Sequence, residues 1–113
     1  MLVAISIPIF TGQLKKARLA TNQANARAAY AATTQYMLDT ATTAKDGNTD
    51  YTYSTSKGQI DTTATAGTTD ISTAAGLDIS KWTTDEASLG DKTYTVWTVT
   101  IDANGTVTAY KAS

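Results

Sequence analysis

The chain contains no cysteine and no histidine, and these two absences remove most classes of enzyme. Without cysteine there are no disulfides, zinc–thiolate sites or thiol nucleophiles. Without histidine the chain lacks the commonest general base and the commonest transition-metal ligand. Serine hydrolase triads and zinc catalysis are therefore excluded, and only carboxylate chemistry stays formally possible. We expect a protein that is not an enzyme and that needs no cofactor.

Charge and long hydrophobic runs are also scarce. The net charge is −1 over 113 residues, so no global field attracts nucleic acid, which is an unlikely partner. The apolar N-terminal run is about half of the roughly twenty residues that span a bilayer. It also lacks the basic start and the cleavage site of a signal peptide. We interpret this run as the end of a longer hydrophobic helix that begins upstream. Threonine supplies roughly a fifth of the residues, a composition that favours exposed strands and an extracellular location.

The first forty residues predict a long helix in two parts. Residues 1–12 form an apolar head and residues 13–41 an amphipathic rod, and we expect continuous helix from about Ile9 to Asp39. Pro8 is expected to start the helix at its first turn. The alternative is that Pro8 and Gly12 form a soft spot between head and rod. A stripe at spacings of three and four is expected to face a sheet: Phe10, Leu14, Ala17, Thr21, Ala24, Ala28, Ala31, Gln35 and Leu38. The opposite face is expected to be solvated: Lys15, Lys16, Arg18, Asn22, Asn25 and Arg27.

Residues 42–113 predict a variable loop followed by a small antiparallel sheet. The stretch 39–76 is expected to be mostly loop, with residues 51–55 as an edge strand. A segment from Leu77 to Trp82 alternates and is expected to enter the sheet. Residues 93–101 and 106–111 then predict a hairpin with the three-residue loop 103–105, which pairs Ile101 with Val107 and needs a positive φ at Gly105. The expected inward face of this hairpin contains Trp97, Val99, Ile101, Val107 and Ala109. The fold class is α+β, a long helix packed on an antiparallel sheet.

Four short motifs suggest chemistry, and each has a simpler structural explanation. Asp46 to Asp50 matches the opening of a calcium loop, but Tyr51 and Lys57 break the pattern, so an Asx-rich turn is favoured. Asn104-Gly105-Thr106 is a formal glycosylation acceptor that the hairpin turn already explains. The adjacent Asp85 and Glu86 are better explained by a capping box from Thr83 to Glu86, starting a one-turn helix that ends at Gly90. The basic cluster Lys15, Lys16, Arg18 and Arg27 is either a solvated face or a contact near the membrane.

The run from Ala4 to Phe10, with Lys15-Lys16-Ala17-Arg18 and the Ala/Asn-rich helix after it, resembles the end of the hydrophobic segment of type IV pilins. The resemblance is specific over residues 4–38 and only architectural beyond them. The family's peptidase site, methylated first residue and docking glutamate would lie upstream of Met1. Its C-terminal disulfide loop is absent, as it is in the cysteine-free pilins of Gram-positive bacteria.

This resemblance implies a structural subunit of a surface filament, anchored in the membrane before assembly and used in attachment or motility. Its partners would be further copies of the chain and the pilus assembly machinery. The expected soft spot is Pro8 and Gly12, and the following residues form the expected assembly interface: Leu2, Val3, Ile5, Ile7, Pro8, Ile9, Phe10 and Leu14. Two alternatives stay open. One is a pseudopilin of a secretion or DNA-uptake system. The other is an adhesin or carbohydrate-binding module with Trp82, Trp97 and the tyrosines as a stacking platform, in which Trp97 is better explained as core and the exposed rings would be Trp82 and Tyr51 or Tyr53.

Overall fold

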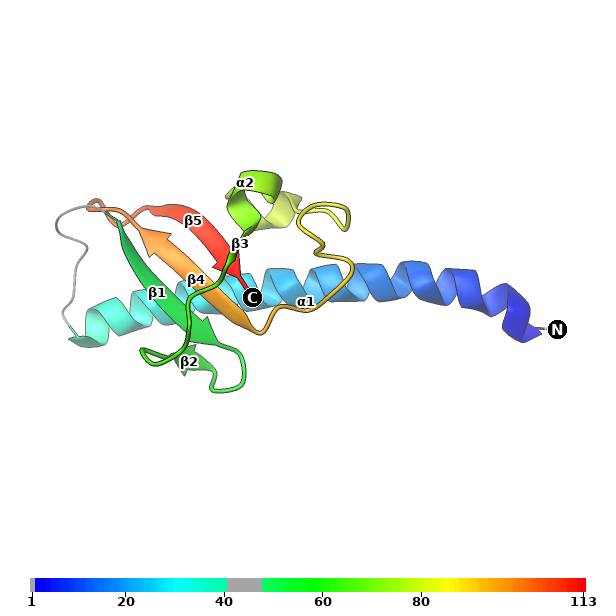
Figure 1. Ribbon diagram of the computed structural model, residues 1–113, viewed down its shortest axis with the longest axis horizontal. Helices are drawn as coiled ribbons and strands as arrows, with labels where there is room; N and C mark the ends of the chain where they lie inside the picture. Colours follow the sequence, from blue (N-terminus) through cyan, green and yellow to red (C-terminus); the bar gives the residue numbers. More distant parts are fainter. Residues whose placement is uncertain (1, 41–47) are drawn as a thin grey trace.

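A computed structural model gives the backbone of residues 2–40 and 48–113 and the side chains of residues 12–39 and 48–113. The chain is α+β: one long N-terminal helix lies along a five-stranded antiparallel sheet (Figure 1). The strands lie in the order β2-β1-β4-β5-β3. The helices are α1 (Leu2–Thr40), α2 (Ile71–Ala75) and the 3-10 helix η1 (Ile79–Lys81). The strands are β1 (Thr49–Ser54), β2 (Gln59–Ile60), β3 (Thr69–Asp70), β4 (Val96–Ile101) and β5 (Val107–Ala112).

Helix α1 is longer at its start than the sequence predicts. It begins at Leu2, so Pro8 lies inside the helix and the expectation that Pro8 starts it is wrong. Proline removes one backbone hydrogen bond and strains the preceding turn, but a helix can continue through it with a bend. The ribbon indeed bends near its N-terminal end (Figure 1). Its 39 residues correspond to roughly 58 Å at 1.5 Å per residue, close to the 61 Å longest extent of the molecule.

The face of α1 that packs on the sheet is not the predicted one. Residues Asn22, Ala26, Ala29 and Thr33 are buried, each at most 1% exposed. Leu38 of the predicted stripe is 74% exposed. At 3.6 residues per turn the two stripes lie roughly 150° apart, nearly on opposite sides of the helix. The predicted stripe is wrong because it followed side-chain hydrophobicity, whereas alanine is small enough to fit either face and the sheet supplies the bulk of the core.

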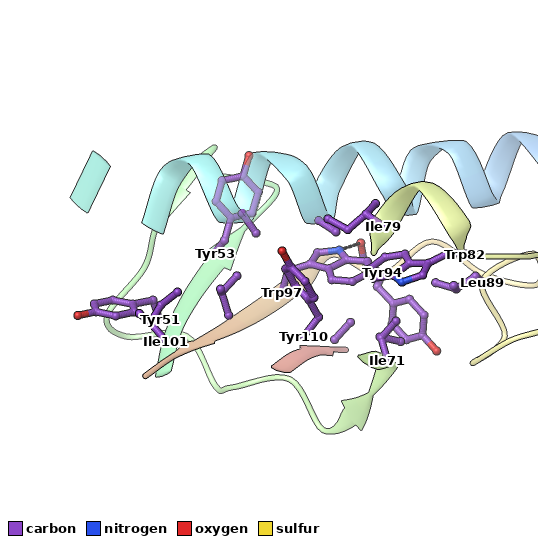
Figure 2. Close-up of a cluster of buried hydrophobic side chains, with 14 residues drawn as sticks. Tyr51, Tyr53, Ile71, Ile79, Trp82, Leu89, Tyr94, Trp97, Ile101 and Tyr110 are labelled. Carbon is purple, nitrogen blue, oxygen red and sulfur yellow. Dashed lines mark hydrogen bonds between the residues drawn. The ribbon is translucent and has the colours of Figure 1, made fainter. Parts of the chain in front are cut away.

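Most of the hydrophobic core is a cluster of aromatic rings on the inner face of the sheet (Figure 2). Trp82 stacks on Trp97 with ring centroids 5.9 Å apart and an interplanar angle of 11°. Tyr94 and Tyr110 contact these two indoles edge to face, each with centroids 5.8 Å apart. Such pairs add stability beyond the area they bury, and their polar ends need partners. Both indole N–H groups have one, on the carbonyls of Gly76 and Tyr94.

The outer face of the sheet is lined by threonines and crossed by the chain between β2 and β3. Thr52 and Thr98 share a hydrogen bond of 3.0 Å between their hydroxyls. The backbone N–H of Gly67 donates to the Thr98 hydroxyl at 2.9 Å as residues 61–68 pass over the strands (Figure 1). A Cβ at Gly67 would lie 2.6 Å from the backbone nitrogen of Ala112, so only glycine fits there. Part of the high threonine content therefore serves this hydroxyl-lined layer.

The C-terminal hairpin agrees with the prediction at its turn, and its strand register departs from the prediction farther from the turn. Ile101 pairs with Val107 and Gly105 has φ +81°, so both predictions are confirmed. A bulge between Thr100 and Ile101 then shifts the register, so that Val99 faces Tyr110 instead of Ala109. Tyr110 is 4% exposed and takes the inward place that had been predicted for Ala109, which is half-buried. An extra residue in one strand reverses the faces beyond it.

Three further predictions about residues 48–91 need correction. Strand β1 lies between β2 and β4 and is not an edge strand. The alternating segment that ends at Trp82 forms the 3-10 helix η1, because Asp78 caps it by accepting the backbone N–H of Ser80 at 3.1 Å. The capping contact of Glu86 with the Thr83 N–H exists at 3.1 Å. No helix follows it among residues 83–91, which form turns with positive φ at Ala87 and Ser88.

Candidate assembly surface

Helix α1 extends beyond the sheet at its N-terminal end, where the ribbon runs free of the strands (Figure 1). Among the predicted assembly residues, Leu2 to Phe10 have helical backbone, and their side chains lie outside the described residues. Leu14 is described and is 36% exposed. The assembly interface therefore stays a prediction. The helical backbone that carries its residues projects from the domain.

The outward face of α1 continues from Leu14 toward Leu38. The residues of this face that the sequence assigned to the core are uncharged, but the exposed Arg27 borders them, and Asp39 follows Leu38 and accepts a hydrogen bond of 3.0 Å from Gln35. Ala17, Ala24 and Ala31 are exposed, and Ala28 is half-buried. Small uncharged side chains allow a second helix to approach closely, at interaxial distances of about 8–10 Å. The exposed alanines of this face are thus suited to close contact with a second helix, whereas Ala28 also packs against the core.

Gly12, the second residue of the predicted soft spot, lies within continuous helix. No heavy atom lies within 4 Å of the position where a Cβ would be, so no close approach of another element requires glycine there. Glycine inside a helix costs roughly 0.5–1 kcal/mol relative to alanine. The soft spot at Pro8 and Gly12 stays a prediction. Proline and glycine each weaken a helix locally, as this prediction requires.

The basic cluster separates into two groups on the helix. Lys15 forms an ion pair with Asp91 at 3.6 Å, and Arg18 is half-buried. By helix geometry Lys15 and Arg18 lie on the side of Asn22, which bonds to Leu89, whereas Lys16 and Arg27 lie more than about 90° away from it. The pair between Lys15 and Asp91 is exposed and contributes at most about 1 kcal/mol. The four residues therefore do not form one common patch.

Asn22 is the residue that positions α1 on the domain, and the sequence analysis placed it in solvent. Its Nδ2 donates to the carbonyls of Leu89 and Lys92 at 2.9 and 2.8 Å. Its Oδ1 accepts the N–H of Tyr94 at 2.9 Å. Gln23 adds a bond of 2.8 Å to the Ile79 carbonyl. Asparagine is a poor helix former, so two asparagines within an alanine-rich helix were the available signal that these side chains bond elsewhere.

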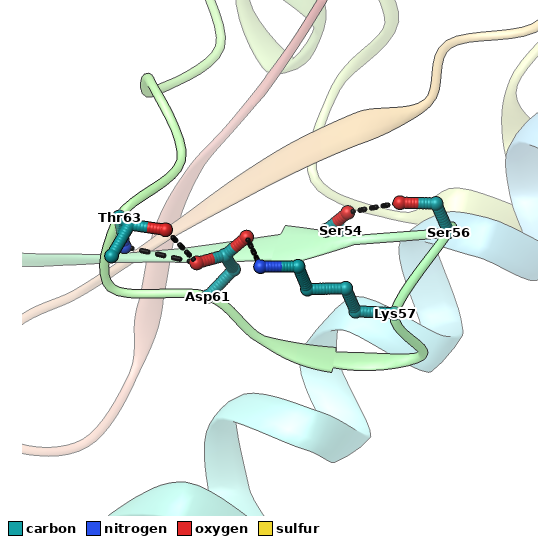
Figure 3. A network of polar contacts seen from close by, with 5 residues as sticks. All are labelled: Ser54, Ser56, Lys57, Asp61 and Thr63. Carbon is teal, nitrogen blue, oxygen red and sulfur yellow. Dashed lines mark hydrogen bonds and ion pairs between the residues drawn. The ribbon is translucent and has the colours of Figure 1, made fainter.

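The β1–β2 hairpin carries the most strongly perturbed carboxyl group (Figure 3). Hydrogen bonds from Thr63 and the ion pair with Lys57 at 2.9 Å lower the pKa of Asp61 to about 2. Similar bonds lower the pKa of Asp70, where Thr73 is the main donor, and of Asp78, where Ser80 is. Asp70 and Asp78 are exposed and the Asp61 side chain is 11% exposed, and all three carboxylates close local turns or caps. These shifts are therefore explained by the turns themselves and do not indicate catalysis.

Two open grooves lie beside this hairpin and share Tyr36 and Ile60. They have volumes of about 310 and 410 Å³. The carboxylates that line the smaller groove already have partners: Thr100 donates to Asp50 at 2.7 Å, and Asp61 binds as described above. Among the described side chains of residues 12–39 and 48–113, no group of three or more acidic, histidine or cysteine residues can hold a metal ion. Asp46 and Gly47 of the predicted calcium loop lie outside the described residues, and Thr49 and Asp50 belong to β1.

The proposed stacking platform of an adhesin is not on the surface. Trp82 is 3% exposed, Tyr51 6% and Tyr53 9%, so the expectation that these rings are exposed is wrong. They belong to the buried cluster under α1, which also contains Trp97, Tyr94 and Tyr110. Trp97, which the sequence placed in the core, is fully buried as predicted.

Over the described residues, no helix combines the length and the hydrophobicity that crossing a membrane requires. Comparison with protein-family models, with curated proteins and with solved structures finds no match for this chain.

Proposed function

We propose that this chain is a non-enzymatic structural subunit of a filament of the type IV pilus kind. The observation that carries the proposal is the projection of the N-terminal part of α1 beyond the sheet (Figure 1). That part carries the apolar head, and the α+β arrangement of one long helix on an antiparallel sheet is compatible with a pilin. In this proposal the head packs in the filament core and the sheet lies outside, on the cell surface.

Association through the head is energetically sufficient. Each large apolar side chain removed from water contributes about 1.5–3 kcal/mol. Six such residues in the head therefore supply about 9–18 kcal/mol, comparable to or above the cost of association, which is about 4–15 kcal/mol. The largely uncharged outward face of α1 adds a surface on which neighbouring helices pack. A contact between different surfaces of successive copies repeats without closing, and so produces an open filament.

The test separates assembly from folding. Ile7→Asp in the full-length gene product, expressed in its own cells, should abolish filaments because it places an unpaired carboxylate in a packed helical core. Ala66→Asp, at an exposed position in the link between β2 and β3, is the matched control and should leave filaments intact. Deleting residues 1–10 should give a soluble monomer with unchanged circular dichroism. Normal filaments from the Ile7→Asp protein, or an unfolded deletion variant, would refute the proposal.

A further inference from the structure

The tip of the β4–β5 hairpin presents an exposed asparagine followed by an exposed glycine. Asn104 and Gly105 both lie in solvent, and no heavy atom lies within 4 Å of the Cβ position of Gly105. The chain has four asparagines, and Asn104 is the one that precedes glycine. Because glycine has no side chain, its own backbone nitrogen is open to approach by the side chain of the preceding asparagine.

We propose that Asn104 is a site of spontaneous deamidation whose rate is controlled by Asp102. The backbone nitrogen of Gly105 loses its proton to hydroxide or buffer base and attacks Cγ of Asn104. The new N–Cγ bond closes a five-membered succinimide, and the side-chain nitrogen leaves as ammonia. Water then opens the ring at either carbonyl and gives aspartate or isoaspartate. The balance needs only water and base, with no oxidant, reductant or enzyme.

The turn holds the reacting nitrogen away from its target. The Gly105 N–H donates to the Asp102 carbonyl at 3.0 Å, so this bond must break before the nitrogen attacks Cγ. The Asp102 carboxylate fixes the loop further, because its Oδ1 accepts the backbone N–H groups of Asn104 and Thr106, each at 2.9 Å. Asp102 and Thr106 close the hairpin through a backbone bond of 2.9 Å. One side chain therefore sets how often the loop opens.

The other described asparagines are protected by their surroundings. Asn22 is buried with three hydrogen bonds, and Asn25 lies in α1 with alanine after it. Helical backbone holds the next nitrogen in the hydrogen-bond ladder of the helix. Asn48 is exposed, but Thr49 follows it, and a β-branched side chain crowds the attacking nitrogen. Asn48 therefore serves as an internal control, because it is exposed like Asn104 but is not followed by glycine.

Deamidation would alter the hairpin in two ways. Either product adds a negative charge beside the Asp102 carboxylate. Isoaspartate also routes the backbone through the former side chain and lengthens it by one carbon within a three-residue loop. The longer loop no longer matches the pairing of Ile101 with Val107, so the end of the β4–β5 ladder should loosen. The proposal does not depend on filament assembly.

The experiment follows the intact purified chain during incubation at mildly alkaline pH, with peptide mapping by mass spectrometry and detection of isoaspartate. We expect the mass gain of an amide-to-acid conversion on the peptide that contains Asn104, with a rate that rises with pH, and none on the peptide that contains Asn48. Asp102→Ala should accelerate the reaction roughly tenfold, because two hydrogen bonds of ordinary strength are lost. Asp102→Ser keeps an acceptor oxygen and should restore most of the protection. Asn104→Gln should abolish the mass gain.

Three results would overturn the proposal. One is an equal rate at Asn48 and Asn104, and another is an equal rate in Asp102→Ala and the wild-type protein. The third is a glycan on Asn104 in protein isolated from its own cells, because the amide nitrogen would then be substituted. Acceleration in urea to the rate of an unfolded Asn-Gly peptide would confirm that the folded turn is the restraint.

Discussion

Replacing Asn22 by alanine tests how α1 is held on the domain. The substitution removes a side chain that is fully buried and leaves three backbone groups of residues 89–94 without their partner. Two of these bonds, to the Leu89 carbonyl and from the Tyr94 N–H, are in buried surroundings, whereas Lys92 is accessible to water. Each buried unsatisfied group costs about 1–3 kcal/mol, so the loss should be about 2–6 kcal/mol. That is a large part of the roughly 5–15 kcal/mol that stabilises an ordinary domain.

The assay is urea unfolding followed by tryptophan fluorescence, since Trp82 and Trp97 report on the core beneath α1. At a slope of about 1–3 kcal/mol per molar urea, the midpoint should fall by at least about 0.7 M. Asn25→Ala is the matched control, because Asn25 makes a single long bond of 3.5 Å to the Tyr94 carbonyl. It should cost less than about 1 kcal/mol. If Asn22→Ala cost no more than Asn25→Ala, the three hydrogen bonds would not anchor the helix and the reasoning would be refuted.

The remaining predictions concern packing and pH. Ala29→Leu should overpack the buried face of α1 and cost about 1–3 kcal/mol in urea unfolding, whereas Ala24→Leu on the outward face should leave the midpoint nearly unchanged; equal effects would contradict the assigned face. Gly67→Ala should lower the melting temperature sharply because its Cβ would overlap the backbone of β5, and Gly12→Ala should raise it through better helix propensity. The pKa of Asp61 is lowered by folding to about 2, so its contribution to stability is complete above its unfolded pKa near 4 and is lost as the pH falls from about 4 to 2. Lys57→Met should raise that folded pKa in an NMR titration, and an unchanged value would exclude the ion pair as a cause.

The parts of the fold that the sequence predicts well are those with a local physical cause. The turn at Gly105 needs a residue that tolerates positive φ, and the pairing of Ile101 with Val107 follows from loop length. The length of α1 toward Thr40 follows from the absence of breakers after Gly12. The bulge in β5 has no such local signal, because it is the packing of the Tyr110 ring against Trp82 that makes the shifted register favourable.

The orientation of α1 shows why a nonlocal choice is harder to predict. Alanine contributes little hydrophobic area, so an alanine-rich helix has nearly equivalent faces and a weak apolar stripe cannot decide between them. The decision comes from the partners across the interface: Asn22 finds three backbone groups of the segment 89–94, and Tyr36 contacts the ring of Tyr51 with centroids 5.9 Å apart. Neither partner is visible from the helix sequence alone. The candidate assembly residues depend on the same choice, because the face not used by the sheet is the face left for another copy.

This division gives α1 two separable roles along its length. Between Asn22 and Tyr36, one side of the helix is committed to the domain by specific hydrogen bonds and aromatic contacts that tolerate little change. The opposite side is built mostly from exposed uncharged residues such as Ala24 and Ala31, with Ala28 packed partly against the core and Arg27 at its border. Charged residues would be the ordinary choice for a solvated helix face, and they would lose their hydration if an apolar helix packed on them. The stripe from Leu14 to Leu38 contains none, although the exposed Arg27 borders it, and this is consistent with the proposed packing of helix against helix. A charge introduced in the stripe, as in Ala24→Glu, should weaken assembly without changing the urea midpoint of the monomer.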